Sequence, residues 1–430
     1  MNHGNKKLLG MLGLAAGLAS TPALATDGYF AHGYGAASKG MGGASFAVGG
    51  HGFAGANNPA TAVDTGDDLQ FGLEWFSPKR KATRSGSAFL DASVESGRED
   101  FMVPEFSWNR KVGEDSAWGV TLYGNGGMNT TYDGGQLDCG FGPNTANLLC
   151  GGGRLGVDLA QLVIAPTFAH RIAPGHSIGI SPLLGYQKFK AFGLQAFDNP
   201  PGFPPFTGSP GNVTNRDYDE SMGAGIRLGY HGQFGAFGVG LTWASKMNMG
   251  KFKKYKGLFA EQGGFDIPSN YGLGVSWRGE SLLVAADVLR IEYSGINSVG
   301  LPSLPVAPLG ANNGPGFGWK DITAWRVGAE WQATNTLKLR AGYNKSDNPI
   351  TPADITFNIL APGVVRDHYS LGLAWDATDS LTFQVAATHA KKETVTGSSL
   401  FNLVFGPGFG GTETISLSED MLTLSVVKRY

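Results

Sequence analysis

Short segments in which apolar and polar residues alternate run along most of this chain. In the first of them, Leu69, Phe71 and Leu73 alternate with Gln70 and Glu74. A period of two residues is typical of a β-strand with one apolar face. The pattern predicts fourteen strands, over residues 68–77, 98–111, 117–132, 158–172, 176–190, 219–232, 236–249, 267–278, 281–294, 319–332, 335–346, 365–376, 380–393 and 418–430.

The connections between these segments alternate between short and long. The first is long, and the next, residues 113–115, is a short turn. Short turns on the periplasmic side and long loops outside are typical of barrels in the bacterial outer membrane. Strands can cross lipid only as a closed sheet, because lipid offers no partner for an unpaired backbone group. Residues 68–430 are therefore predicted to form an all-β, 14-stranded antiparallel transmembrane β-barrel.

The N-terminus has the features of a secretory signal. Lys6 and Lys7 are followed by an apolar stretch over residues 8–19, and residues 23–25 (Ala-Leu-Ala) fit a cleavage site. Residues 1–25 are thus expected to be a signal peptide. No later run approaches the roughly 18 apolar residues of a spanning helix. The expected location is the outer membrane of a Gram-negative bacterium.

About forty residues, 26–67, separate the signal peptide from the first strand. They are rich in Gly and Ala, nearly uncharged, and show no strand alternation. A barrel of this size would leak unless it were filled, since about 8 strands enclose only their own side chains while 16–18 leave a channel. Residues 26–67 are therefore expected to form a plug, or hatch, in the lumen.

Charge and cysteine content exclude several classes of function. The formal net charge of −2 argues against a nucleic-acid partner. Cys139 and Cys150 lie in one loop, and an exported protein meets oxidising conditions, so a disulfide is expected, with two free thiols as the alternative. The loop offers only Asp138 as a further metal ligand, so we expect no metal and no cofactor.

Two motifs resemble those of enzymes but lack the required context. Residues 175–179 spell Gly-x-Ser-x-Gly at a hairpin rather than at a strand-to-helix turn, and the glycines of residues 151–156 precede no helix. We therefore expect no enzymatic activity.

Several motifs resemble one known family. They are residues 40–44 (GMGGA) and Asn58-Pro59-Ala60 before the first strand, 123–130 (YGNGGMNT) in the third, 158–162 (DLAQL), 319–321 (WKD) and 339–343 (LRAGY). The chain resembles the FadL-type outer-membrane transporters of long-chain fatty acids and aromatic hydrocarbons. The resemblance implies a monomeric barrel with an N-terminal hatch, lying in outer-membrane lipid and taking up hydrophobic small molecules passively. Where the family has Phe-Lys-Asp this chain has Trp-Lys-Asp, and the third to fifth long loops diverge.

The long loops are unusually apolar, and a large exposed apolar patch usually marks a binding site. A ligand-capture groove is expected there, formed by Phe192, Leu194, Phe197, Phe203, Phe206, Phe401 and Phe405. Alternatively, these loops fold over one another and only close the top of the barrel.

Glycines interrupt the third strand at Gly124, Gly126 and Gly127, on either side of Asn125. Interior glycines often mark a bulge or kink, and in the family such a kink lets the ligand leave sideways into the bilayer. The alternative is a glycine patch against which the plug packs.

Asn58-Pro59-Ala60 is the expected gate element of the hatch, because Pro fixes φ and Asn bonds nearby backbone. The alternative is an ordinary turn.

Lys320 matches the family position that meets a ligand carboxylate, since a buried ammonium needs an anionic partner. The alternative is an ion pair with Asp321 or another acid.

The expected function is passive uptake of long-chain fatty acids, with neutral aromatic hydrocarbons or alkanes as the alternative for the same fold. The alternatives of another class are an adhesin or structural barrel and an outer-membrane lipid hydrolase.

Overall fold

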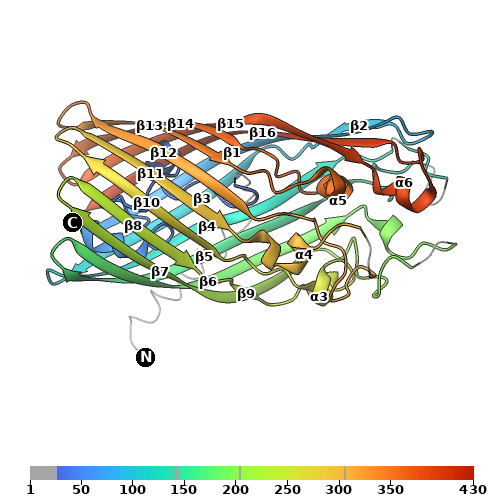
Figure 1. Cartoon of the computed structure of the whole chain (residues 1–430), viewed down its shortest axis with the longest axis horizontal. Helices are drawn as coiled ribbons and strands as arrows, with labels where there is room; N and C mark the ends of the chain where they lie inside the picture. Colours follow the sequence, from blue (N-terminus) through green and yellow to red (C-terminus); the bar gives the residue numbers. More distant parts are fainter. Residues whose placement is uncertain (1–26, 136, 141–144, 203–204, 305–306) are drawn as a thin grey trace.

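The computed structural model describes residues 27–430 except 136, 141–144, 203–204 and 305–306. These residues form a long closed barrel with short turns at one end and helix-containing loops at the other (Figure 1). The sequence-based expectations for residues 1–25, for Thr26 and for Phe203 lie outside the described residues. None of the described helices has the length and apolar composition needed to cross a bilayer.

The predicted fourteen-stranded antiparallel barrel is confirmed. Each wall strand pairs with its neighbours in chain order, and the last pairs with the first to close the sheet. The wall strands are β1 (Asp68–Ser85), β3 (Phe101–Val112), β4 (Ser116–Tyr132), β5 (Leu155–Ala173), β6 (His176–Phe192), β7 (Asp219–Phe234), β8 (Phe237–Ala244), β10 (Asn270–Arg278), β11 (Leu282–Ile291), β12 (Ile322–Gln332), β13 (Leu337–Ser346), β14 (Asp367–Thr378), β15 (Leu381–Ser398) and β16 (Thr412–Arg429).

Short elements lie in the plug and in the extracellular loops. The short strands β2 (Ala92–Glu95) and β9 (Asn248–Met249) pair with β1 and β7. The plug holds α2 (Ala36–Gly40) and the 3₁₀ helix η1 (Pro59–Asp64). The loops hold η2 (Gln195–Phe197), η3 (Lys253–Tyr255), α3 (Ala260–Gly263), η4 (Tyr293–Gly295), α4 (Asn297–Gly300), η5 (Pro352–Asp354), α5 (Ile355–Asn358) and α6 (Leu400–Phe405).

The alternation seen in the sequence separates the two faces of the wall. On β1, Phe71 is 59% exposed on the outer face, whereas Gln70 and Glu74 are buried on the inner face. On β12, Trp325 is exposed and Arg326 is buried in the same way. The outer face is therefore apolar, as lipid requires, and the inner face is polar.

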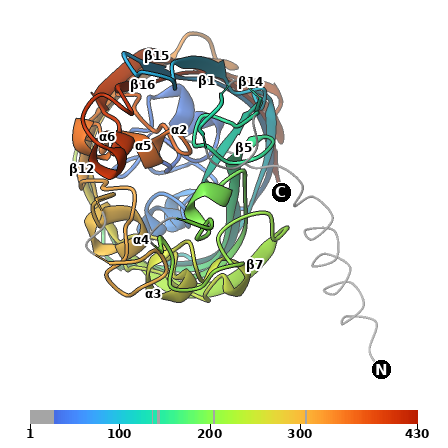
Figure 2. The same ribbon diagram turned by 90° about the vertical axis from the view of Figure 1, so that its right-hand side faces the viewer.

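Residues 27–67 lie inside the barrel, where they cross the lumen (Figure 2). Helix α2 contacts β13 to β16, and η1 contacts β4 to β7. Glycines on the inner wall allow the plug backbone to approach closely: a Cβ at Gly240 would lie 1.8 Å from the Phe46 carbonyl oxygen, and one at Gly342 would lie 2.1 Å from the Gly42 nitrogen. Part of the high glycine content thus serves the contact between plug and wall.

Buried charges join the plug to the wall. The Lys39 ammonium lies 2.9 Å from Glu74 on β1 and 3.0 Å from Glu105 on β3. Asp27 pairs with Arg326 at 2.8 Å. All of these side chains are almost fully buried. Removing one partner from such a group leaves an uncompensated buried charge, which costs about 3–5 kcal/mol.

Candidate functional site

The ladder between β3 and β4 stops halfway along the wall. Its last pair toward the extracellular side is Phe106 with Leu122. Beyond it, no ladder is described between residues 101–105 of β3 and residues 123–131 of β4. Further out, Ser96 pairs with Tyr132 and the wall is joined again. We call this section, residues 101–105 and 123–130, the wall window, because no ladder joins β3 to β4 there.

The bend in β4 explains the wall window. The register between β4 and β5 shifts between Gly124 and Gly126, so that Asn125 forms a bulge. Residues 123–130 are all buried, unlike the alternating residues 117–122. This loss of alternation shows that β4 turns into the barrel, as a bulge allows. On the opposite edge, Pro104 has no N–H to offer a neighbouring strand.

The plug takes the place that β3 leaves. Phe30 forms a bridge with Gly126, and the Ala31 amide donates to the Asn125 carbonyl oxygen at 3.3 Å. A Cβ at Gly126 would lie only 1.7 Å from the Tyr29 carbonyl oxygen. The sequence allowed two interpretations of these glycines, a bend in the wall and a close approach of the plug. Both features are present at the kink.

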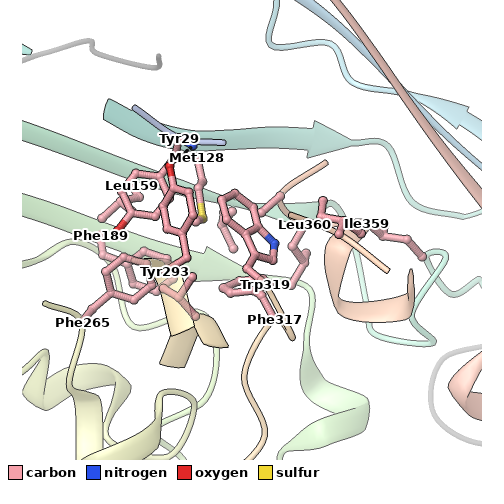
Figure 3. Packing of buried hydrophobic residues seen from close by; sticks show 14 of the residues in the cluster. Tyr29, Met128, Leu159, Phe189, Phe265, Tyr293, Phe317, Trp319, Ile359 and Leu360 are labelled. Atoms are coloured by element: carbon pink, nitrogen blue, oxygen red, sulfur yellow. Dashed lines mark hydrogen bonds between the residues drawn. The ribbon is translucent and has the colours of Figure 1, made fainter. Parts of the chain in front are cut away.

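An aromatic cluster stands between the wall window and the loops (Figure 3). The Tyr29 ring lies 5.0 Å from that of Tyr293 and 5.7 Å from that of Trp319, measured between centroids. The Tyr293 hydroxyl donates to the Asp27 carbonyl oxygen at 2.5 Å. The Trp319 indole donates to the Asn358 side chain at 2.6 Å. We call Tyr29, Tyr293 and Trp319 the aromatic partition.

Two small cavities lie beside this partition. The loop cavity, of about 40 Å³, is lined by residues that include Phe189, Leu194, Phe197, Phe317, Phe357 and Leu360. The exit cavity, of about 20 Å³, lies behind the wall window and is lined by Tyr29, Phe76, Arg80, Met128, Trp319 and Glu419 among others. Phe317 lines the loop cavity and Trp319, two residues on, lines the exit cavity. Tyr29 and Trp319 of the partition thus border the exit cavity, and the Trp319 ring lies 6.5 Å from that of Phe317, which borders the loop cavity.

The apolar loop residues fall into separate groups. Leu194 and Phe197 are buried and line the loop cavity, and Phe206 packs on Phe197 with the ring centroids 5.8 Å apart. Phe192 lines a different, polar cleft near Arg98 on the outside of the partition. Phe401 and Phe405 pack together in α6, with the Arg84 guanidinium 4.8 Å from the Phe401 ring. The six of these positions that the structure describes therefore do not form one groove.

Lys320 lies at the extracellular start of β12, and its side chain is exposed, which differs from the buried ammonium expected from the sequence. Its backbone amide donates to the Pro349 carbonyl oxygen at 2.9 Å. It lines neither the loop cavity nor the exit cavity. Its expected partner Asp321 instead pairs with Arg290 at 3.3 Å. The residue that reaches the lumen is the preceding Trp319, which is 1% exposed.

Asn58 lies at the contact between the plug and the wall and is fully buried. Its side-chain amide donates to the carbonyl oxygens of Phe46, at 2.8 Å, and Tyr230, at 3.0 Å. Its side-chain oxygen accepts from the Ala60 amide at 3.1 Å, and Pro59 begins η1. Asn58 therefore caps η1 and ties it to β7, which suits the predicted gate position.

The disulfide between Cys139 and Cys150 is present, with the Cα atoms 5.8 Å apart. It closes part of the loop between β4 and β5, where both cysteines are buried. This confirms the prediction made from their spacing and from the export signal.

We expect His32 to make the seating of the plug dependent on pH. Burial, followed by the charges of His368, Lys39 and Arg326, lowers the pKa of His32 well below its usual value of 6.5. Protonation therefore favours a displaced plug, so the docked state is stable above about pH 6.5 and weakens as the pH falls below it. We expect ion conductance in planar bilayers to rise from pH 7 to pH 5. In a His32→Asn variant this rise should shrink; an equal rise in both proteins would exclude His32 as its cause.

The fold and these cavities define a class of protein: an outer-membrane β-barrel channel for hydrophobic molecules. The sequence profile of one family, described as outer membrane protein transport protein (OMPP1/FadL/TodX), matches residues 14–399. The chain belongs to this family. Among proteins with curated annotation, none matches the sequence.

Solved structures show the same fold at low sequence identity. The toluene transporter TodX of Pseudomonas putida aligns with a TM-score of 0.67 and 18% identity, over 93% of this chain and 99% of that one. A FadL homologue of Pseudomonas aeruginosa aligns at 0.67 and 14%, over 93% and 99%. The toluene transporter TbuX of Ralstonia pickettii aligns at 0.63 and 15%, again over 93% and 99%.

Proposed function

We propose that this channel takes up small neutral hydrophobic molecules, above all aromatic ones, and releases them through the wall window into the bilayer. The observation that carries this route is the series of loop cavity, aromatic partition and exit cavity, which ends behind the section of wall where no ladder joins β3 to β4. The loop cavity and the partition consist mainly of apolar and aromatic side chains, so a hydrophobic solute would stay out of water over this part of the route. Movement would follow the concentration gradient.

The lining of the loop cavity favours neutral ligands. The residues around it include four phenylalanines of the loops and no charged side chain among those described. A carboxylate buried there would have no partner, which costs several kcal/mol. Two of the aligned structures are those of toluene transporters, which agrees with this preference. In this proposal the channel acts as a monomer, and Asn58-Pro59-Ala60 holds the plug while the ligand passes.

Long-chain fatty acids are the second candidate, and Lys320 is the residue that favours them. An exposed ion pair contributes only about 0.2–1 kcal/mol. We therefore expect Lys320→Ala to weaken fatty-acid binding by no more than about fivefold, with no change for ethylbenzene, as measured by titration calorimetry. A much larger loss confined to the fatty acid would reverse the order of the two candidates.

Uptake by cells tests the proposed function directly. Cells that lack other hydrophobic channels should take up radiolabelled ethylbenzene faster when they produce this protein, and sucrose uptake should not change. Equal rates for ethylbenzene with and without the protein would refute the proposal. Faster uptake of a fatty acid alone would select the second candidate.

A further inference from the structure

Arg80 and Glu419 face the exit cavity without touching each other. Arg80 on β1 lies opposite Leu417, and Pro78 lies opposite Glu419 on β16, so Arg80 and Glu419 are diagonal neighbours across the ladder. Both side chains are buried, at 6% and 0% exposure, and both line the exit cavity. Among the described residues, no ion pair joins them within 4.0 Å.

Arg80 and Glu419 each have polar side-chain atoms without a hydrogen-bond partner among the described residues. Neither carboxylate oxygen of Glu419 has a hydrogen-bond partner, and the Arg80 Nε also lacks one. The terminal guanidinium nitrogens are held elsewhere, by the carbonyl oxygens of Asn129 and Arg98 and, at 3.5 Å, by that of Pro78. The Glu419 carboxyl and Arg80 Nε thus face a space of about 20 Å³, which is also lined by Tyr29 and Asn129, whose hydroxyl and side-chain oxygen have no hydrogen-bond partner among the described residues.

Apart from Asn129, the other residues around this space are apolar, aromatic or glycine. Phe76, Met128 and Trp319 supply much of its lining, and Phe101 stacks on the Arg80 guanidinium with 5.7 Å to the ring centroid. A buried carboxylate without partners is costly, and a group that donates one hydrogen bond and accepts another would relieve that cost. A hydroxyl does both, whereas a carboxylate has no hydrogen to donate to a Glu419 oxygen.

We propose that Arg80 and Glu419 form a hydroxyl-binding subsite at the wall window, so that the channel prefers hydrophobic molecules that carry one neutral hydroxyl, such as phenols and alcohols, over plain hydrocarbons and carboxylates. The hydroxyl donates to a Glu419 oxygen and accepts from Arg80 Nε. This inference rests on the proposed uptake function and names its substrate class. A phenol is suited to the subsite because, with a pKa near 10, it is neutral at pH 7.

The test compares 4-ethylphenol with ethylbenzene, which differ by one hydroxyl. We expect wild-type protein to favour 4-ethylphenol in protein-dependent uptake and Glu419→Met to lower the ratio of the two rates by about tenfold, the effect of losing one hydrogen bond to a charged group. Glu419→Gln should lie between them. Asp420→Asn is the matched control, because this neighbouring acid is half exposed and pairs with His389 instead.

The outcomes separate this inference from the function on which it rests. If the wild type takes up both compounds and Glu419→Met leaves their ratio unchanged, the subsite is refuted and the channel function stands. If neither compound shows protein-dependent uptake, both proposals fail. If Glu419→Met does not assemble, as judged by heat-modifiable gel migration, a crystal of wild-type protein with 4-bromophenol decides. The hydroxyl of 4-bromophenol should lie between Arg80 and Glu419. The inference would be overturned if bromine signal appeared only at other places, or if the cavity held water alone.

Discussion

Gly127→Trp should reduce ethylbenzene uptake to the background of cells without the channel. Gly127 lies on β4 at the wall window and lines the exit cavity. An indole there would fill a space of about 20 Å³ and occupy the wall window. The loops and the loop cavity would be unchanged, so binding of ethylbenzene to purified protein should persist while uptake is lost. Radiolabelled uptake and titration calorimetry, run on the same variant, measure the two effects.

Val120→Trp is the matched control for this experiment. Val120 lies on the same strand but below the wall window, and it is paired on both sides, with Trp108 and Pro166. A lipid-facing Trp is common in such barrels, so uptake through Val120→Trp should equal that of the wild type. If Gly127→Trp assembles and transports normally, lateral release is wrong and a route past the plug into the periplasm becomes the better account.

Lys39→Met should loosen the plug and make the channel permeable to small hydrophilic solutes. The substitution leaves Glu74 and Glu105 buried without their cation, whereas in the intact protein each lies within 3.0 Å of it. The cost is about 3–5 kcal/mol in the docked state, so displacement of the plug should become at least about a hundredfold more frequent. Single-channel conductance and sucrose entry into proteoliposomes measure the leak.

A triple variant distinguishes loss of charge balance from loss of packing. Lys39→Met combined with Glu74→Gln and Glu105→Gln removes all three charges, and replacing a buried ion cluster by neutral groups is often nearly neutral in stability. We expect the triple variant to leak far less than Lys39→Met. An equal leak in both would show that the Lys39 side chain acts through its packing, and no leak in either would show that the plug is held by its other contacts.

The barrel could be predicted from the sequence because lipid imposes a simple pattern on it. Alternation with a period of two located all fourteen wall strands. The errors lie at strand ends, where the lipid no longer constrains the chain. β1 continues to Ser85 rather than residue 77, since its outer part pairs with β2 and β16 above the membrane. β8 ends at Ala244 rather than residue 249, because the Ser245 hydroxyl accepts from the Ile226 amide and interrupts the ladder.

The residues of the candidate site were harder to predict, because distant contacts position them. The sequence pattern places Trp319 as the first residue of a strand. In the structure its indole donates a hydrogen bond to Asn358 in α5, and this bond orients the Trp319 side chain into the lumen. Tyr29 lies in a segment without periodicity, and only the fold brings it to Tyr293. Arg80 lies in a predicted loop and Glu419 in a predicted strand, and nothing in the sequence relates the two residues. They become neighbours only through the register between β1 and β16.

Sequence signals did locate the kink and the plug contact. The glycines around Asn125 marked the bulge, because a strand interior rarely tolerates them without a reason. The Asn58-Pro59 pair marked the start of η1, since an Asn that caps and a Pro at the first helical position favour a helix start. The apolar loop residues marked a binding region, but sequence alone could not divide them between the loop cavity and α6.

The most direct test of the route is a crystal structure with 4-bromotoluene, whose bromine can be located by anomalous scattering. The proposed route predicts bromine in the loop cavity beside Phe197 and Phe317, and in the exit cavity beside Met128 and Gly127. The rings of Tyr29 and Trp319 should be displaced between the two positions. Bromine along a path past Asn58 toward the periplasmic end, with none at the wall window, would contradict the proposed route.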